Sequence, residues 1–284
     1  MTSNTPETPD APPAVSTRQH TLAGTVRFDG FGLLLGEPVS LELEPAEPGH
    51  GIVFERTDLD PPVRIPAIVD YVVPRGRRTT LRSGEATVET VEHFMSALAG
   101  LGIDNLLVRI HGPELPGFDG SSLRFVEGLR EVGVVEQDES RKIFDLREAV
   151  VIDEGDAMIA AIPHDAPGMR VVFDLDYRDH SDRLPRQVFT WDTAEGDYPD
   201  QVAPCRTFSL EHEAKAMWER GIGRHLTYKD VLVIGENGPI ENAYRFDDEP
   251  VRHKVLDALG DLYLIGCPVR CRIVAHRSGH GLNR

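Results

Sequence analysis

The segment from Val251 to Leu262 places an imidazole and a carboxylate where they can act together. Its apolar residues recur at helical spacing, which predicts a helix. His253 and Asp257 are four residues apart, so both side chains lie on one face of that helix, one turn apart. Burying both groups toward a core is costly unless something pairs them. A divalent metal would pair them, and so would a simple ion pair.

A second polar doublet, Glu92 and His93, interrupts the apolar residues of the segment 86–102. The apolar spacing predicts one helix over this segment, ended by Gly100 or Gly102. Adjacent side chains point about 100° apart around a helix, so these two cannot bind one ion in the same way. The His can act as a metal ligand while the Glu acts as a base. The His-Glu-x-x-His motif uses a Glu beside a His in this way, but this sequence lacks that motif. The alternative is a helix with an exposed Glu-His edge.

A third candidate, His280, stands between Gly279 and Gly281 near the end of the chain. Glycines on both sides predict a tight loop that presents the imidazole where the backbone bends or approaches another group. Alone this is a weak indication, because chain ends often lack order.

The candidate residues belong to four motifs that are separated along the sequence. They are Thr-Val-Glu-His with Ser-Ala-Leu-Ala-Gly-Leu-Gly-Ile-Asp-Asn, Cys-Arg-Thr-Phe, Arg-His-Lys-Val-Leu-Asp-Ala-Leu-Gly-Asp-Leu, and Ser-Gly-His-Gly-Leu-Asn, in that order. From about Thr21 to Asn283 the sequence resembles the UDP-3-O-acyl-N-acetylglucosamine deacetylase family, the zinc enzymes of lipid A biosynthesis. The resemblance covers nearly the whole chain, and four motifs in the right order make it specific.

The resemblance implies a catalytic zinc site with His93, His253 and Asp257 as ligands. The fourth position is left for a water, whose pKa zinc lowers to about 7. Glu92 would take the proton of that water as the general base. Two imidazoles and a carboxylate with open positions also suit ferrous iron.

The resemblance also implies roles for Thr207, His280 and Asp261. Thr207 would help to stabilise the tetrahedral oxyanion. His280 would act as a cationic stabiliser and as the acid for the leaving sugar amine, oriented by Asp261. The residues alone favour a different interpretation of Asp261, as a helix-end residue that contacts solvent. The family's last helix has no counterpart here, so we expect reduced packing around His280.

Substrate contacts follow from the same resemblance. Lys254 would meet the phosphates of the nucleotide sugar, and the implied contacts with the rest of the substrate are Phe208, Asp176 and Tyr177. Tyr177 replaces a family Phe and keeps an aromatic face toward uridine, although a core aromatic is an equal alternative.

The sequence departs from the family pattern at two places. Leu34 replaces a His in the family's Gly-Leu-His, and since that His is not a zinc ligand we expect retained activity with altered local polarity. His225-Leu226 replaces a Gly-Gly in the acyl-chain passage. Bulkier residues there would narrow the passage or select another chain, so the acyl preference stays open.

The implied activity is zinc-dependent hydrolysis of the N-acetyl group of UDP-3-O-(3-hydroxyacyl)-N-acetylglucosamine, which gives the free glucosamine amine and acetate. One alternative is a deacetylase of a different acylated amino-sugar nucleotide. Another is a catalytically silent regulator that binds the lipid precursor. A silent relative would be expected to lose a ligand or the base, whereas this sequence has them all.

Composition limits the remaining classes of function. The net charge of −17 over 284 residues argues against a nucleic-acid surface. No apolar run is long enough for a spanning helix and no signal-peptide core is present. Three cysteines are too few for a disulfide framework, so we expect a cytoplasmic protein. We expect a monomer whose partner is the small nucleotide-sugar lipid precursor.

Alternating strands and helices predict an α+β fold of two similar domains. Each would be a layer of mostly antiparallel strands packed with two helices, with the active site in the cleft between them. Domain I would span 20–137 and domain II 138–284. Residues 1–19, rich in Thr, Pro, Ser and Ala, would form a disordered tail.

Overall fold

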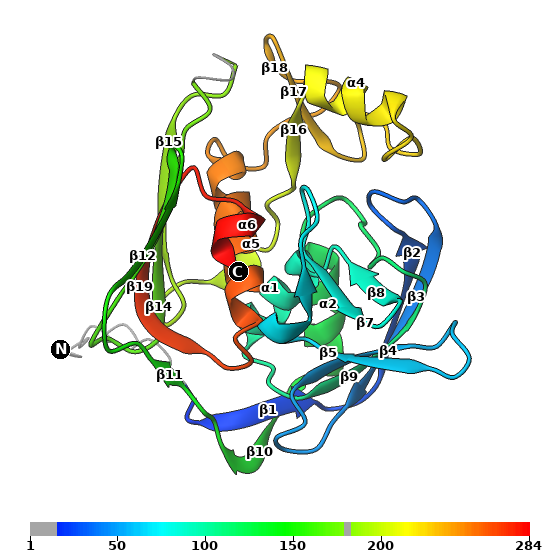
Figure 1. Ribbon diagram of the computed structural model, residues 1–284, viewed down its shortest axis with the longest axis vertical. Helices are drawn as coiled ribbons and strands as arrows, with labels where there is room; N and C mark the ends of the chain where they lie inside the picture. Colours follow the sequence, from blue (N-terminus) through cyan, green and yellow to red (C-terminus); the bar gives the residue numbers. More distant parts are fainter. Residues whose placement is uncertain (1–15, 179–182) are drawn as a thin grey trace, which may run out of the picture.

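The computed structural model describes residues 16–178 and 183–284, and it is an α+β fold of two halves (Figure 1). Of the expected tail, residues 1–15 lie outside the described residues, whereas Arg18 and Gln19 belong to β1 (Arg18–Leu22). That strand pairs antiparallel with β10 (Val134–Ser140). The expected domain boundary at 137/138 therefore lies within a paired strand.

The main sheet of the first half has the strand order β2-β3-β9-β4-β5. Its neighbours pair antiparallel except β9 and β4, which run parallel. The strands are β2 (Val26–Phe31), β3 (Pro38–Pro45), β4 (Ile52–Arg56), β5 (Val63–Pro66) and β9 (Leu106–His111). A short 3-10 helix, η1 (Val69–Tyr71), leads into a small sheet of β6 (Val72–Val73), β7 (Thr80–Ser83) and β8 (Ala86–Glu89).

The main sheet of the second half repeats this plan, with the order β12-β13-β19-β14-β15 and a parallel pair, β19 and β14. In both halves the last strand in sequence is the central one, so the two sheets have the same topology. The strands are β11 (Phe144–Asp145), which joins β19, then β12 (Val150–Glu154), β13 (Ala157–Ile162), β14 (Met169–Leu175), β15 (Gln187–Asp192) and β19 (Val269–His276). A small sheet contains β16 (Phe208–Leu210), β17 (Leu232–Gly235) and β18 (Gly238–Pro239).

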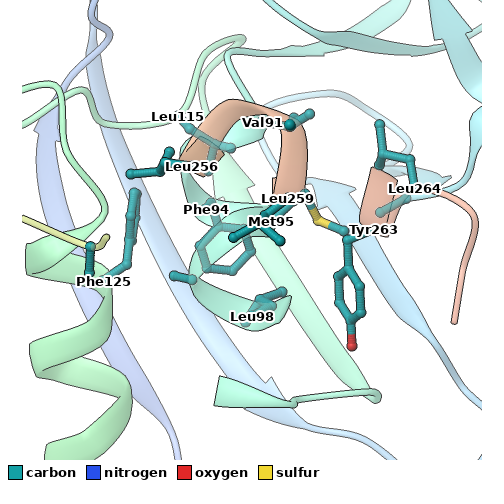
Figure 2. Close-up of a cluster of buried hydrophobic side chains, with 14 of the residues drawn as sticks. Val91, Phe94, Met95, Leu98, Leu115, Phe125, Leu256, Leu259, Tyr263 and Leu264 are labelled. Carbon is teal, nitrogen blue, oxygen red and sulfur yellow. The ribbon is translucent and has the colours of Figure 1, made fainter. Parts of the chain in front are cut away.

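The helices lie between the two main sheets, except the helix of residues 211–219, which lies beside the small sheet of β16, β17 and β18 (Figure 1). They are α1 (Glu92–Leu101), α2 (Leu123–Val132), α3 (Tyr198–Gln201), α4 (Glu211–Glu219), α5 (Glu249–Tyr263) and α6 (His280–Asn283). Figure 2 shows apolar side chains of α1, α2 and α5 packed into one core, in which Phe94 and Phe125 meet edge to face with ring centroids 5.2 Å apart. Burial of such side chains holds α1 and α5 together. Among the described residues, none of the helices combines the length and apolarity needed to cross a bilayer.

The helix expected over 251–262 is confirmed as α5. The single helix expected over 86–102 is wrong in its first part. Residues 86–89 form β8, Thr90 has a positive φ of 57°, and the helix begins at Glu92. Apolar spacing cannot separate the two states here, because Thr87 and Val88 are β-branched and fit a strand paired with β7. Gly102 ends α1 in the left-handed conformation, as the sequence predicts.

Candidate active site

Two helices, one from each half, bring the candidate ligands together. His93 lies in the first turn of α1, while His253 and Asp257 lie one turn apart on α5. The helices approach closely where Gly260 faces the start of α1, because a Cβ on Gly260 would clash with the carbonyl oxygen of Glu92. Glycine at this position therefore sets the distance between the two groups of polar side chains.

His93, His253 and Asp257 form a buried cluster whose ligand atoms all lie within 4.8 Å of one another. Oδ1 of Asp257 is 3.3 Å from Nε2 of His253 and 3.7 Å from Nε2 of His93. Nδ1 of His253 lies 3.0 Å from the carbonyl oxygen of Cys205. That carbonyl accepts a hydrogen bond from the Nδ1–H tautomer, which leaves the Nε2 lone pair facing the cluster.

The cluster fits a divalent cation. Nε2 of His253 and Oδ1 of Asp257 are buried without a hydrogen-bond partner, which is costly unless a ligand supplies the missing interaction. Burial, and next the proximity of His253, lowers the pKa of His93 to about 3, so its imidazole is neutral and able to ligate. Burial opposes ionisation of Asp257, but His253 and Lys254 outweigh it and hold the pKa of that carboxyl well below its usual range. Two imidazoles and a carboxylate are a donor set that suits a catalytic zinc site.

Glu92 lies beside this cluster in the first turn of α1, with only 2% of its surface exposed. Burial raises the pKa of its carboxyl to about 7. Oε2 accepts a hydrogen bond of 3.0 Å from the backbone N–H of Thr79, and Oε1 lies 3.6 Å from Nε2 of His280. A carboxylate with a pKa near 7 suits a general base at neutral pH.

His280 is held by Asp261, whose Oδ2 lies 2.8 Å from its Nδ1. The same oxygen accepts a hydrogen bond of 2.9 Å from Nδ2 of Asn283, and Oδ1 accepts one of 2.6 Å from the Thr79 hydroxyl. Burial lowers the pKa of His280, but Asp261, Glu92 and the cluster carboxylate outweigh it and raise that pKa to about 9. The expectation of reduced packing around His280 is wrong, since its side chain is only 12% exposed. A protonated imidazole at neutral pH follows from this environment.

Thr79 is a site residue that the sequence did not indicate. It is fully buried and binds Glu92 through its N–H and Asp261 through its hydroxyl. The isolated sequence offers no pattern that would have singled out this threonine, which immediately precedes β7. Its position follows only from the long-range packing of the first half against α5.

A cavity of about 730 Å³ opens above the cluster. It is lined by most of the site residues expected from the sequence, namely Glu92, Asp176, Tyr177, Thr207, Phe208, His253, Lys254, Asp257 and His280. His93 and Asp261 are absent from its wall and lie behind it. Lys254 donates a hydrogen bond of 2.7 Å to Oδ2 of Asp257, and Asp176 accepts from Arg178.

The two candidate aromatic contacts lie together on the wall of this cavity. Tyr177 meets Phe208 edge to face, with ring centroids 5.8 Å apart. Tyr177 thus packs against a neighbour and also lines the open space, so the two alternatives left by the sequence are compatible. Part of the remaining wall is apolar and comes from the turn after β2, α4, the loop between α4 and β17, and β17: Leu33, Leu34, Met217, Trp218, Ile222, Leu226, Val231 and Val233.

Buried potential ligands, a carboxylate that titrates near neutrality and a paired imidazole at one cavity are the parts of a metal-dependent hydrolase. Comparison with known proteins is more specific. The sequence model of LpxC, described as UDP-3-O-acyl N-acetylglycosamine deacetylase, matches residues 19–284, and the chain belongs to that family.

Three curated relatives share the name UDP-3-O-acyl-N-acetylglucosamine deacetylase. The protein of Myxococcus xanthus is 39% identical over 94% of this chain and 84% of its own length. The protein of Cellvibrio japonicus is 39% identical over 94% of this chain and 88% of its own length. The protein of Thermosynechococcus vestitus is 40% identical over 95% of this chain and 93% of its own length. The chain is thus an enzyme of the hydrolase class, related to deacetylases over nearly its whole length.

Proposed function

We propose that this protein removes the N-acetyl group of UDP-3-O-(3-hydroxyacyl)-N-acetylglucosamine, a step of lipid A biosynthesis, in the cytoplasm. The observation that carries the proposal is the His93, His253 and Asp257 cluster beside Glu92 and His280. Zinc is the metal we infer for the cluster, and ferrous iron suits the same ligands. The names of the relatives supply the substrate class.

A bound divalent ion would supply Lewis-acid chemistry at the acetamide and lower the pKa of a water beside it. Glu92 takes the proton of the attacking water, because its carboxyl titrates near neutrality. A carbon–oxygen bond forms at the acetyl carbon, and the carbonyl oxygen becomes an oxyanion. His280, protonated at neutral pH, stabilises that charge, with the Thr207 hydroxyl as a further donor on the cavity wall.

The carbon–nitrogen bond then breaks, and the sugar nitrogen takes a proton as acetate leaves. His280 is placed to give this proton and to share proton transfer with Glu92, since Oε1 of Glu92 is 3.6 Å away. Asp261 positions the imidazole and fixes its tautomer through Nδ1. Lys254, Tyr177 and Phe208 are proposed to hold the nucleotide part of the substrate.

Acetate release from UDP-3-O-(3-hydroxyacyl)-N-acetylglucosamine tests the proposal. The purified protein is assayed as isolated, after chelation, and after readdition of zinc, with ferrous iron added anaerobically as a second arm. Loss and recovery of turnover would support a metal-dependent deacetylase. Absence of acetate in every arm, with one equivalent of metal bound, would contradict it and favour a silent regulator that binds the precursor.

We predict a bell-shaped dependence of kcat/KM on pH. The rate falls below about pH 7, because Glu92 must be ionised and its pKa is raised to about 7, and a nearby cation moves this limb lower. The rate falls above about pH 9, because His280 must be protonated and its pKa is raised to about 9. Replacing His280 by Gln should remove the alkaline limb. An alkaline limb that persists in this variant would assign it to another group.

We predict that Leu226→Gly shifts the acyl preference toward longer chains. Leu226 lines the cavity and narrows this end of the space, whereas its neighbour His225 is exposed and packs against Gly36. The ratio of kcat/KM for a long-chain to a short-chain substrate should rise on the order of 10-fold, the effect expected for one or two methylenes in an apolar pocket. The short-chain substrate is the internal control. An unchanged ratio would show that Leu226 does not limit the length of the acyl chain. Turnover of a different acylated amino-sugar nucleotide, and not of these two substrates, would instead support the alternative deacetylase.

A further inference from the structure

We propose that one end of the molecule docks onto an anionic lipid bilayer. This docking face consists of Phe31, at the end of β2, Leu35, from the turn after β2, and Arg220, Ile222, Arg224 and Lys229, from the loop after α4. The inference goes beyond the proposed deacetylation, since binding to a bilayer is measured without turnover. It rests on the position, exposure and charge of these residues.

The two segments of the docking face pack against each other. The backbone N–H of Gly223 donates a hydrogen bond of 2.8 Å to the carbonyl oxygen of Leu34. A Cβ on Gly36 would clash with the imidazole of His225, so the turn and the loop are also in contact there. Residues far apart in sequence therefore form one continuous surface, near α4 in Figure 1.

The docking face exposes large apolar side chains. Phe31 is 58% exposed, Leu35 43% and Ile222 36%. Ile222 also lines the cavity, together with Leu33 and Leu34 of the same turn. Apolar surface thus continues from the inside of the cavity to the outside of the protein. Large apolar side chains exposed on two segments that pack together are typical of an interaction site.

The loop after α4 gives the docking face a charge opposite to that of the molecule, whereas exposed Asp29 and Glu37 flank the turn after β2. Residues 220–229 contain Arg220, Arg224 and Lys229 and no Asp or Glu, in a chain of net charge −17. Acidic residues flank this stretch at Glu219 and Asp230, and the side chain of Asp230 is bonded to Thr227. The guanidinium of Arg224 is held at the end of α4 by the carbonyl oxygen of Trp218. Exposed apolar groups beside basic ones are the two signals that together bind a protein to an anionic membrane surface.

A second exposed apolar surface, on β12, differs from the docking face in the charge of its neighbouring residues. Val150, Val151 and Ile152 are all exposed, Val151 by 61%. Acidic residues accompany them in sequence, at Glu148, Asp153, Glu154 and Asp156. An anionic bilayer would repel this surface. Val151 therefore provides a matched control for loss of an exposed apolar side chain.

Vesicle co-sedimentation of the full chain tests the proposal. The vesicles are phosphatidylcholine with and without phosphatidylglycerol, at low and at high salt. The wild type should bind the anionic vesicles and should be released by salt. Arg220→Gln with Lys229→Gln should lower the partition coefficient on the order of 10-fold or more, and Phe31→Ser with Leu35→Ser on the order of 10-fold.

Matched variants distinguish docking from general effects. Arg130→Gln with Lys142→Gln makes the same change in net charge on other exposed residues, and Val151→Ser removes an exposed apolar side chain; both should bind as the wild type does. Circular dichroism checks that each variant is folded. The proposal would be overturned if the wild type failed to bind anionic vesicles, or if the docking-face variants bound them as tightly as the wild type. Sedimentation of the protein without vesicles would also overturn it and would identify a second copy of the chain as the occupant. Acetate release is assayed separately, so failure of the proposed chemistry would leave the vesicle result intact.

Discussion

Replacing Glu92 by Gln should lower kcat of deacetylation about 10²- to 10⁴-fold, the range expected for loss of a general base. Gln has nearly the same shape and can still accept the hydrogen bond that Thr79 N–H donates to Oε2 of Glu92. It cannot take a proton at any accessible pH. The variant should therefore retain its fold while losing the acid limb of the pH profile.

Measuring the metal content distinguishes loss of the general base from damage to the cluster of candidate metal ligands. The Glu92→Gln variant should still bind one equivalent of zinc, because His93, His253 and Asp257 are unchanged. Glu114→Gln is a matched control, since Glu114 is also buried but bonds to the backbone N–H groups of Leu34 and Leu35. Its kcat should stay within a few-fold of wild type. Full turnover in Glu92→Gln would show that another group removes the proton.

The parts of the candidate site that lie on one element could be predicted from the sequence. The spacing of His253 and Asp257 on a strongly periodic segment fixed their common face, and α5 has that geometry. The helix that carries His93 was also predicted, although the preceding strand β8 was missed. Short strands in small sheets carry too few residues for a clear period-2 pattern.

The parts that depend on packing between the halves could not be predicted. Nothing in the local sequence shows that Gly260 lies against the carbonyl oxygen of Glu92, or that Thr79 reaches Asp261 across 182 residues of sequence. The residues alone favoured a solvent-exposed Asp261, yet it is buried because Thr79, His280 and Asn283 all bind it. Burial of a carboxylate depends on partners that only the folded chain brings together.

Replacing Asp257 by Ala should abolish tight metal binding and, with it, turnover. Changes to groups that merely support metal ligands weaken affinity by about 10- to 100-fold, so removal of a ligand should weaken it on the order of 100-fold or more. The substitution also leaves the Lys254 ammonium without the carboxylate to which it donates at 2.7 Å. A largely buried charge deprived of its partner is destabilising, so the melting temperature should fall even in the metal-free protein.

Two measurements test this prediction separately. Competition with a chelator gives the zinc affinity, and thermal unfolding with and without zinc gives the stability that the metal adds to the folded state. In the wild type the midpoint should rise with zinc, and in Asp257→Ala the rise should disappear. Asp248→Asn, at the start of the same helix and paired with Arg252 rather than with the cluster, should retain both the affinity and the zinc-dependent rise. If Asp257→Ala bound zinc as tightly as Asp248→Asn, the assignment of Asp257 as a ligand would be wrong, and the buried cluster would be a structural ion pair.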